Sequence, residues 1–388
     1  MPEHDAMGEA LQRLEHHDAP SGRVSSLAQI TRRTALTGGA AGLVAVMLEA
    51  CGSTAGAAAD SNTAATAKTA KTAKTATSAS TVAPIFGVKR AYRFTFVNHA
   101  TSNPFFIPTI NGIEDACALL GCTYEWTGSD ASDVGQMASA ITTAISAGVD
   151  GIATTLIAPA LATPVAAALS AGIPVIAYNA DEPGTGRLAY VGQDLLRSGQ
   201  EMGRKIRHMI PGGGEIVVFI STPGLANVAP RLDGIRQVLR GSNIVVRSQA
   251  SGATLPQETA AIDAFISTHL ASFTGYFGVD AGSTLALAQA ISQHNLKGKV
   301  LGGGFDLLPQ TQQLLFDHTI QFAIDQQPYL QGFLATLELF LYRASQRLTG
   351  AADVNTGVEF LYPRTIRPYA TTTSRYEGTG TNTGVQRA

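Results

Sequence analysis

Residues that could hold a small polar ligand recur in one kind of place along this chain, in the segments that follow short apolar runs. They are Asn98, His99, Asn103, Phe105, Phe106, Asn179, Arg231, Asp280, Asp306 and Gln326. Carboxylates accept protons from hydroxyl groups, arginine and amide groups donate to oxygen, and aromatic faces cover the C–H groups of a ring. This set of side chains predicts a binding site for an uncharged, polyhydroxylated molecule.

Each of these residues also has a simpler interpretation when it is taken alone. Asn and Asp commonly cap the helix that follows a strand, and they are frequent in turns. The hypothesis of a binding site therefore depends on the recurrence of such residues at several predicted strand ends.

The elements that must position these residues follow from the hydrophobic pattern after residue 91. Ile110, Ile113 and Cys117 share one helical face, and Gly121 favours the left-handed end of that helix. Helices are predicted at 161–170, 194–209 and 329–348 and between the remaining strands. Strands are predicted at 93–97, 151–157, 173–178, 188–191, 216–220, 244–246, 275–279, 300–305, 320–324 and 357–361.

Alternating strands and helices predict an α/β fold with two lobes, each a parallel sheet wound on both faces by helices. Ligands of such sheets bind outside the carboxyl ends of the strands, which is where the residues above fall. The predicted lobes are 89–192 with 327–352, and 193–326 with 353–363. The polar tail 364–388 is expected to be disordered.

The first part of the chain predicts export rather than folding. Arg32-Arg33 precedes a weakly apolar run at 35–48, which is too short to cross a membrane and is typical of a twin-arginine signal within residues 1–50. The run ends at Cys51 in a sequence that resembles a lipobox, although Glu49 is unusual there. The Ala-, Thr- and Lys-rich segment 51–88 predicts a flexible tether. We therefore expect a protein outside the cytoplasmic membrane, anchored by a lipid on Cys51.

Composition and missing motifs exclude several classes of protein. A net charge of −2 over 388 residues, without a basic stripe in the folded part, argues against binding to nucleic acid. Phosphate-loop, zinc and nucleophile-elbow motifs are missing, so we expect no cofactor, no metal and no catalytic residue. Cys117 and Cys122 are interpreted as a packed helical cysteine and a cysteine that enters a strand, rather than as a bridge.

Several motifs resemble those of the periplasmic ribose- and galactose-type binding proteins, over about residues 91–362. They are 103–106 (NPFF), 172–176 (GIPVI), 230–234 (PRLDG), 279–284 (VDAGST), 304–306 (GFD) and 326–328 (QQP). The resemblance implies two lobes joined by three crossing segments, near 192–193, 326–327 and 353–358, which close on a sugar. It also implies a monomer that delivers a monosaccharide or polyol to an ABC permease. Sugar hydrogen bonds would fall on Asn103, Arg231, Asp280, Asp306 and Gln326, with stacking on Phe105 and Phe106.

One departure from this pattern leaves the ligand open. Where the ribose-binding pattern has an Asp-Arg pair, this chain has Asn179-Ala180, so a hexose or sugar alcohol is as well supported as a pentose. Trp126 either supplies an additional ring to the site or packs in the core.

The sequence leaves other functions open beside sugar uptake. They are a sugar sensor for a signalling receptor, a binder of a nucleoside or amino acid, a sugar-responsive transcription regulator, and an enzyme that uses Asp280 or Asp306 as a base. Our primary prediction is the capture subunit of a sugar importer, and not an enzyme.

Overall fold

The structure is a computed structural model that describes residue 88 and residues 90–270, 272–349 and 351–371. Apart from residue 88, the described residues belong to the two predicted lobes or to the first part of the predicted tail. The predicted export signal, Cys51, nearly all of the predicted tether, and residues 372–388 of the tail lie outside the described residues.

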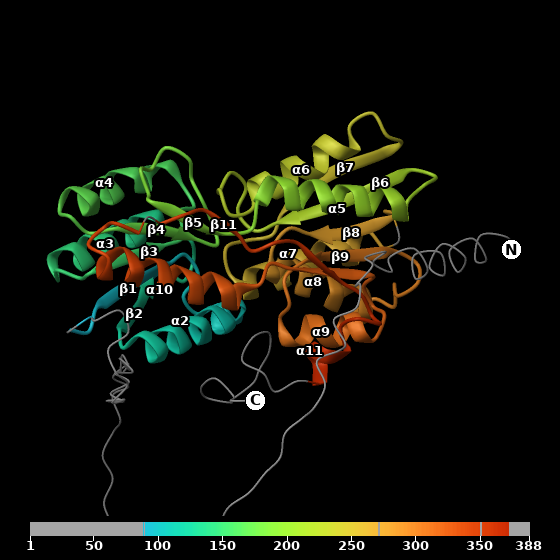
Figure 1. The fold of residues 1–388 in the computed structure, drawn as a ribbon. Helices are drawn as coiled ribbons and strands as arrows, with labels where there is room; N and C mark the ends of the chain where they lie inside the picture. Colours follow the sequence, from blue (N-terminus) through green and yellow to red (C-terminus); the bar gives the residue numbers. More distant parts are fainter. Residues whose placement is uncertain (1–87, 89, 271, 350, 372–388) are drawn as a thin grey trace, which may run out of the picture. The chain divides into compact units, whose positions relative to one another are not determined.

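The first lobe is built on a six-stranded sheet of order β11-β5-β4-β3-β1-β2, in which all pairs are parallel (Figure 1). Its strands are β1 (Arg93–Asn98), β2 (Thr123–Gly128), β3 (Gly151–Thr154), β4 (Val175–Tyr178), β5 (Ala189–Gly192) and β11 (Val354–Asn355). Its helices are η2 (Pro104–Phe106), α2 (Ile107–Leu120), α3 (Val134–Ser146), η3 (Pro159–Leu161), α4 (Ala162–Ser170) and α10 (Pro328–Ala344).

The second lobe repeats this plan with the order β12-β10-β9-β8-β6-β7, and only β12 runs antiparallel to its neighbour. Its strands are β6 (Gly214–Ile220), β7 (Ile244–Ala250), β8 (Gly275–Gly278), β9 (Leu301–Phe305), β10 (Phe322–Asp325) and β12 (Glu359–Leu361). Its helices are α5 (Leu195–Met209), α6 (Ala229–Leu239), α7 (Leu255–Thr268), α8 (Ala281–Gln293), α9 (Pro309–Phe316) and α11 (Arg367–Thr371).

Both faces of the first sheet are buried, because its central strands are apolar on both sides. Phe94 and Phe96 of β1 pack in one cluster with residues of α2 and α10, whereas Val97 packs in another with residues of α3 and α4. Successive strand residues point to opposite faces, so these two clusters lie on the two sides of one sheet. The predicted α/β fold with two parallel-sheet lobes is confirmed.

The chain passes between the lobes three times. The crossings are at 193–194 between β5 and α5, at 326–327 between β10 and α10, and at 356–358 between β11 and β12. These positions agree with the predicted crossing segments. The predicted lobe boundary at residue 353 is wrong, because Val354 and Asn355 pair with β5 in the first sheet.

The prediction of a disordered tail from residue 364 is also wrong for the part of the tail that the structure describes. Residues 367–371 form α11, and Ile366 before it is fully buried in an apolar cluster of the second lobe. Tyr369 of α11 packs against the same cluster, so these two side chains anchor a segment whose other residues are mostly polar.

Among the described residues, every helix is too short or too polar to cross a membrane.

Cys117 lies in α2 and Cys122 directly precedes β2. Both side chains are buried, and no disulfide joins them in this structure.

Candidate functional site

Several of the polar residues lie where the strand order reverses in each sheet. In the first lobe β1 lies between β2 and β3, and His99 after β1 has Nδ1 3.1 Å from Oγ1 of Thr155 after β3. In the second lobe Asp280 after β8 accepts at Oδ2 from the backbone N–H of Ser221 after β6, at 3.0 Å. The loops diverge at such points and leave room for a ligand beyond the strand ends.

Arg231 is the cation of this region and lies in the first turn of α6, 3% exposed. Its Nη1 donates to the carbonyl of Val279 at 2.9 Å, and its Nη2 donates to Oε1 of Gln193 at 3.2 Å. The guanidinium lies over the ring of Phe305, 4.1 Å from the centroid. Burial lowers its pKa, and the charge of Asp306 is the largest opposing effect. An arginine in this state remains charged and presents a rigid set of donors.

A second chain of contacts links Asp306, Gln326 and Asn179. Gln326 Nε2 donates to Asp306 Oδ1 at 2.6 Å, and Asn179 Nδ2 donates to Gln326 Oε1 at 3.2 Å. Asp306 and Asn179 have φ of 75° and 64°, a left-handed conformation that Asp and Asn adopt more readily than most residues. Burial raises the pKa of Asp306 to about 6, while Arg231 opposes that rise.

His99 connects the two lobes through Asn227, a residue that precedes α6 in the second lobe. Asn227 Nδ2 lies 3.2 Å from His99 Nε2, and an amide nitrogen can only donate. His99 Nε2 is therefore the acceptor, and Nδ1 carries the proton and donates to Thr155. Burial, followed by the charge of Arg231, lowers the pKa of His99 to about 4, so the ring is neutral near neutral pH.

Two buried polar atoms of this region have no hydrogen-bond partner among the described residues. They are Oδ1 of Asn227, an acceptor, and Nε of Arg231, a donor. Leaving such a group unpaired costs about 1–3 kcal/mol. A hydroxyl group of a ligand can both donate and accept, so it could satisfy either atom.

Three predicted site residues already have bonds within their own lobe. Asn98 accepts from the N–H of Ala100 and donates to the hydroxyl of Tyr178. Asn103 caps η2 by accepting from the N–H of Phe105. Asp280 caps α8 by accepting at Oδ1 from the N–H of Ser283, and its Oδ2 accepts from the N–H of Ser221. The capping interpretation from the sequence therefore describes Asp280 and Asn103, whatever further contacts they make.

Glu258 is linked to Asp280 through the hydroxyl of Ser283, and the sequence did not predict this role. Ser283 Oγ lies 3.0 Å from both Glu258 Oε2 and Asp280 Oδ2. Burial first, and then the charge of Asp280, raises the pKa of Glu258 to about 11. Glu258 is therefore protonated at neutral pH, and it contributes no negative charge beside Asp280.

The predicted stacking rings lie in an aromatic cluster. Phe105 and Phe106 meet edge to face with centroids 4.8 Å apart, and Phe106 lies 5.5 Å from the His99 ring. Trp126 lies 5.9 Å from Phe106 and donates its indole N–H to the carbonyl of Thr101. Trp126 therefore packs beside a predicted stacking ring, and its polar atom is satisfied within the protein.

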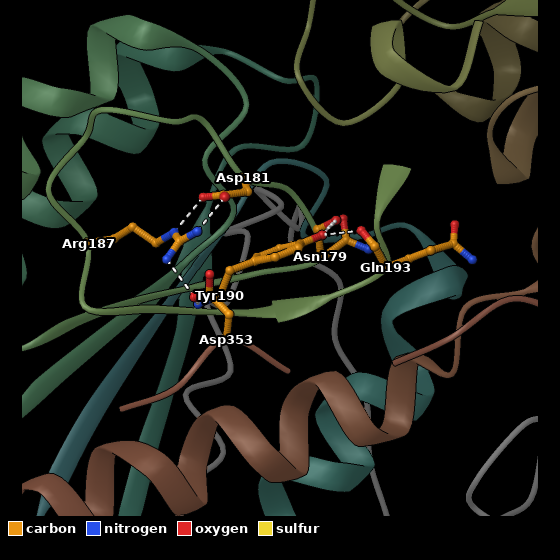
Figure 2. A network of polar contacts seen from close by, with 6 residues as sticks. All are labelled: Asn179, Asp181, Arg187, Tyr190, Gln193 and Asp353. Atoms are coloured by element: carbon orange, nitrogen blue, oxygen red, sulfur yellow. Dashed lines mark hydrogen bonds and ion pairs between the residues drawn. The ribbon is translucent and has the colours of Figure 1, made fainter. Parts of the chain in front are cut away.

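Gln193 in the first crossing joins the site to the crossing segments. Besides accepting from Arg231, it donates to the carbonyl of Gly357 in the third crossing at 2.9 Å. Figure 2 shows Tyr190 beside it, with its hydroxyl 2.9 Å from Gln193 O and 3.0 Å from Asn179 O. Gln193 is fully buried, so these bonds are shielded from water.

An ion-pair network holds the start of β11, the strand that precedes the third crossing, to the rest of the first lobe (Figure 2). Arg187 contacts both carboxylate oxygens of Asp181 at 2.6 Å and reaches Asp353 at 2.7 Å. Asp353 also accepts from the N–H of Tyr190 at 2.8 Å. Asp353 immediately precedes β11, so the network positions that strand against β5.

The structure thus connects most of the predicted residues and adds others. His99, Phe106, Asn179, Arg231, Asp306 and Gln326 belong to connected contacts. Gln193 and Asn227 also follow strands β5 and β6, and the rule applied elsewhere in the chain could have found them. Glu258 lies inside α7 and carries no such signal. Across the described residues no cluster of His, Cys, Asp or Glu is arranged to hold a metal ion.

Comparison with known proteins gives the family. A profile of the family described as periplasmic binding protein domain matches residues 94–342. The chain is 44% identical over 306 residues to the xylose/arabinose-binding protein XylF of Sulfolobus acidocaldarius, and the match covers 75% of each chain.

Two solved structures are similar across nearly their whole length. A solute-binding protein of an ABC transporter from Burkholderia graminis, in complex with D-arabinose, has a TM-score of 0.67 and 25% identity, covering 74% of this chain and 99% of the other. A carbohydrate transporter protein from Acidothermus cellulolyticus, in complex with myo-inositol, has a TM-score of 0.63 and 26% identity, covering 72% and 97%. With its two parallel-sheet lobes, three crossings and polar residues at the strand ends, this chain belongs to the periplasmic binding protein family.

Proposed function

We propose that this protein captures a free pentose of the xylose or arabinose type and delivers it to an ABC permease. As a member of a family of extracytoplasmic binding proteins, the chain is a receptor and not an enzyme. The relative from Sulfolobus acidocaldarius is named for xylose and arabinose, and the similar Burkholderia graminis protein was crystallised with D-arabinose. Both relatives indicate a pentose, whereas the sequence alone supported a pentose, a hexose and a polyol equally.

The observation that carries the proposal is the pair of unsatisfied atoms, Asn227 Oδ1 and Arg231 Nε, within a buried polar cluster. An uncharged sugar supplies hydroxyl groups for such atoms without bringing a charge into the site. Asp306 and Gln326 would accept and donate further hydroxyl bonds, and Phe106 would cover a face of the ring. Asn98, His99, Asn103, Phe105, Asn179 and Asp280 complete the proposed site.

Binding would favour the closed arrangement of the lobes because the ligand touches both. Nδ2 of Asn227 in the second lobe already lies 3.2 Å from Nε2 of His99 in the first lobe. The N–H of Ala226 also donates to the carbonyl of Ile157 across the lobes at 2.9 Å. A sugar bound between these segments stabilises the closed form by the difference between its binding free energies to the closed and the open form. It cannot stabilise that form by more than this difference.

Titration calorimetry of the purified protein tests the substrate class. D-xylose and both arabinose enantiomers are expected to bind, with D-ribose, D-glucose, D-galactose, myo-inositol and a panel of amino acids and nucleosides as comparisons. Saturable binding of an amino acid or nucleoside, with no response to any carbohydrate, would refute the proposal.

Arg231→Ala is expected to weaken pentose binding by about 1.5–3 kcal/mol, a 10- to 150-fold higher Kd, because charged hydrogen bonds in a buried site are lost. Arg236→Ala is the matched control, since Arg236 lies on the same helix with its side chain 46% exposed. An unchanged Kd for Arg231→Ala would remove this residue from the site.

We also propose that the chain is exported through a twin-arginine signal and anchored by a lipid on Cys51. Support comes from Arg32-Arg33, the short apolar run and the tether-like composition of 52–82. Metabolic labelling with a fatty-acid analogue should mark the wild-type protein and not Cys51→Ser. Replacing both arginines with lysine should leave the protein in the cytoplasm; export that continues would exclude this route.

A further inference from the structure

The turn that ends α2 brings the thiols of Cys117 and Cys122 into direct contact. Gly121 has a φ of 69°, and the N–H groups of Gly121 and Cys122 both donate to the carbonyl of Cys117, at 2.9 and 3.2 Å. This left-handed turn folds the chain back over the last turn of the helix. As a result the two Sγ atoms lie 3.1 Å apart.

We propose that Cys117 and Cys122 are a disulfide-forming pair, oxidised in the mature protein outside the cytoplasm. The oxidant is the disulfide of a thiol–disulfide oxidoreductase. One cysteine thiolate attacks that disulfide to form a mixed disulfide, and the second displaces the enzyme's sulfur. The protein loses two protons and two electrons and gains one S–S bond, while the oxidoreductase becomes a dithiol.

The surroundings of the pair decide when this exchange can occur. Both side chains are buried, 6% and 8% exposed, in the apolar cluster on one face of the first sheet. Contact with Cys122 and burial both raise the pKa of Cys117, so the packed thiol is not a nucleophile. Exchange therefore requires local opening of the helix end, and the bond is shielded from reductants once the turn closes.

The bridge would have a structural consequence at the edge of the first sheet. Cys122 directly precedes β2, which is the terminal strand in the sheet order and, among the described residues, pairs only with β1. A covalent link from β2 to α2 restrains this edge, which otherwise depends on one ladder of hydrogen bonds. The sugar site lies at the other end of the strands, so the bridge should not alter affinity.

Mass spectrometry of the protein exported by its native host tests the proposal. Free thiols are alkylated under denaturing conditions without reductant, and the chain is cleaved after glutamate. Cleavage at Glu114 and Glu125 releases residues 115–125, which carry both cysteines and exclude Cys51. We expect this fragment to be unalkylated and lighter than the dithiol by two hydrogen atoms, and to take two alkyl groups only after reduction.

Two alkyl groups on this fragment without prior reduction, or a link from either cysteine to Cys51, would overturn the proposal. A variant with Cys117→Ala and Cys122→Ala serves as the control for packing. We expect a reductant to lower the Tm of the wild type by a few degrees and to leave the Tm of this double variant unchanged. The wild type and the double variant should bind the same sugar with the same Kd.

Discussion

At the scale of single residues, the site combines buried charges whose protonation states are set by their neighbours. Arg231 is charged, His99 is neutral, and Asp306 titrates near pH 6 because burial opposes its ionisation. Glu258 keeps its proton, because burial raises its pKa to about 11. Such an arrangement suits a ligand without charge, because the buried cation Arg231 already has an acidic neighbour, Asp306, within the site.

The pKa of Asp306 predicts how binding depends on pH. A sugar hydroxyl that donates to the carboxylate favours its ionised form, so binding below about pH 6 must release a proton. We expect a constant Kd above about pH 7 and a Kd that rises toward tenfold per unit as the pH falls below 6. Calorimetry at several pH values measures this.

Asp306→Asn is the control for this pH dependence. The amide cannot titrate, so the variant should bind more weakly and show the same Kd at pH 7 and pH 5. His99 titrates near pH 4, below this window. A wild-type Kd that is equal at pH 7 and pH 5 would contradict the assignment of Asp306 as a hydroxyl acceptor.

At the scale of elements, glycines set how closely paired helices approach. A Cβ at Gly199 of α5 would lie 2.1 Å from the carbonyl oxygen of Arg231 in α6, and one at Gly234 of α6 would lie 2.3 Å from that of Leu196. Helices α2 and α10 meet in the same way, since a Cβ at Gly332 would lie 2.1 Å from the oxygen of Thr109. The position of Arg231 therefore depends on a residue with no side chain.

Gly199→Ala should push α6 away from α5 and displace Arg231 from its partners. We expect a Kd at least tenfold higher, together with a lower Tm, because overpacking typically costs about 1–3 kcal/mol. Gly203 lies one turn along α5, and a Cβ added there would be 3.0 Å from Cβ of Val238. Gly203→Ala therefore tests strain between the same two helices at a point farther from Arg231. If both variants change the Tm and neither changes the Kd, the link between helix spacing and the site is wrong.

At the scale of the whole molecule, the crossings are bonded to one another as well as to the site. Thr356 in the third crossing donates its hydroxyl to the carbonyl of Gln326 in the second at 2.8 Å. Gln193 in the first crossing bonds Gly357 in the third and also accepts from Arg231. A ligand that reorients Arg231 would therefore act directly on the segments about which the lobes move.

Gln193→Ala should weaken pentose binding by about 1–2 kcal/mol, a 5- to 30-fold higher Kd, because a buried donor of Arg231 and the Gly357 carbonyl lose their partner. The dissociation rate, measured by stopped-flow fluorescence of Trp126, should account for most of the change. Gln237→Ala removes a comparable amide contact from an exposed glutamine pair and should leave both values unchanged. An unaltered dissociation rate in Gln193→Ala would show that the crossing does not hold the closed form.

The hydrophobic pattern of the sequence determined the α/β elements and the two lobes, because strand and helix periods depend on neighbours along the chain, whereas the three crossings were implied by the resemblance to sugar-binding proteins. It also placed Arg231, Asp306 and Gln326 at strand ends, where parallel sheets bind ligands. Only the tertiary structure decided that Val354 pairs with β5, that Glu258 and Asp280 share the hydroxyl of Ser283, and that Asn227 contacts His99 across the lobes. These contacts join residues far apart in sequence, so their partners exist only once the sheets and helices have packed.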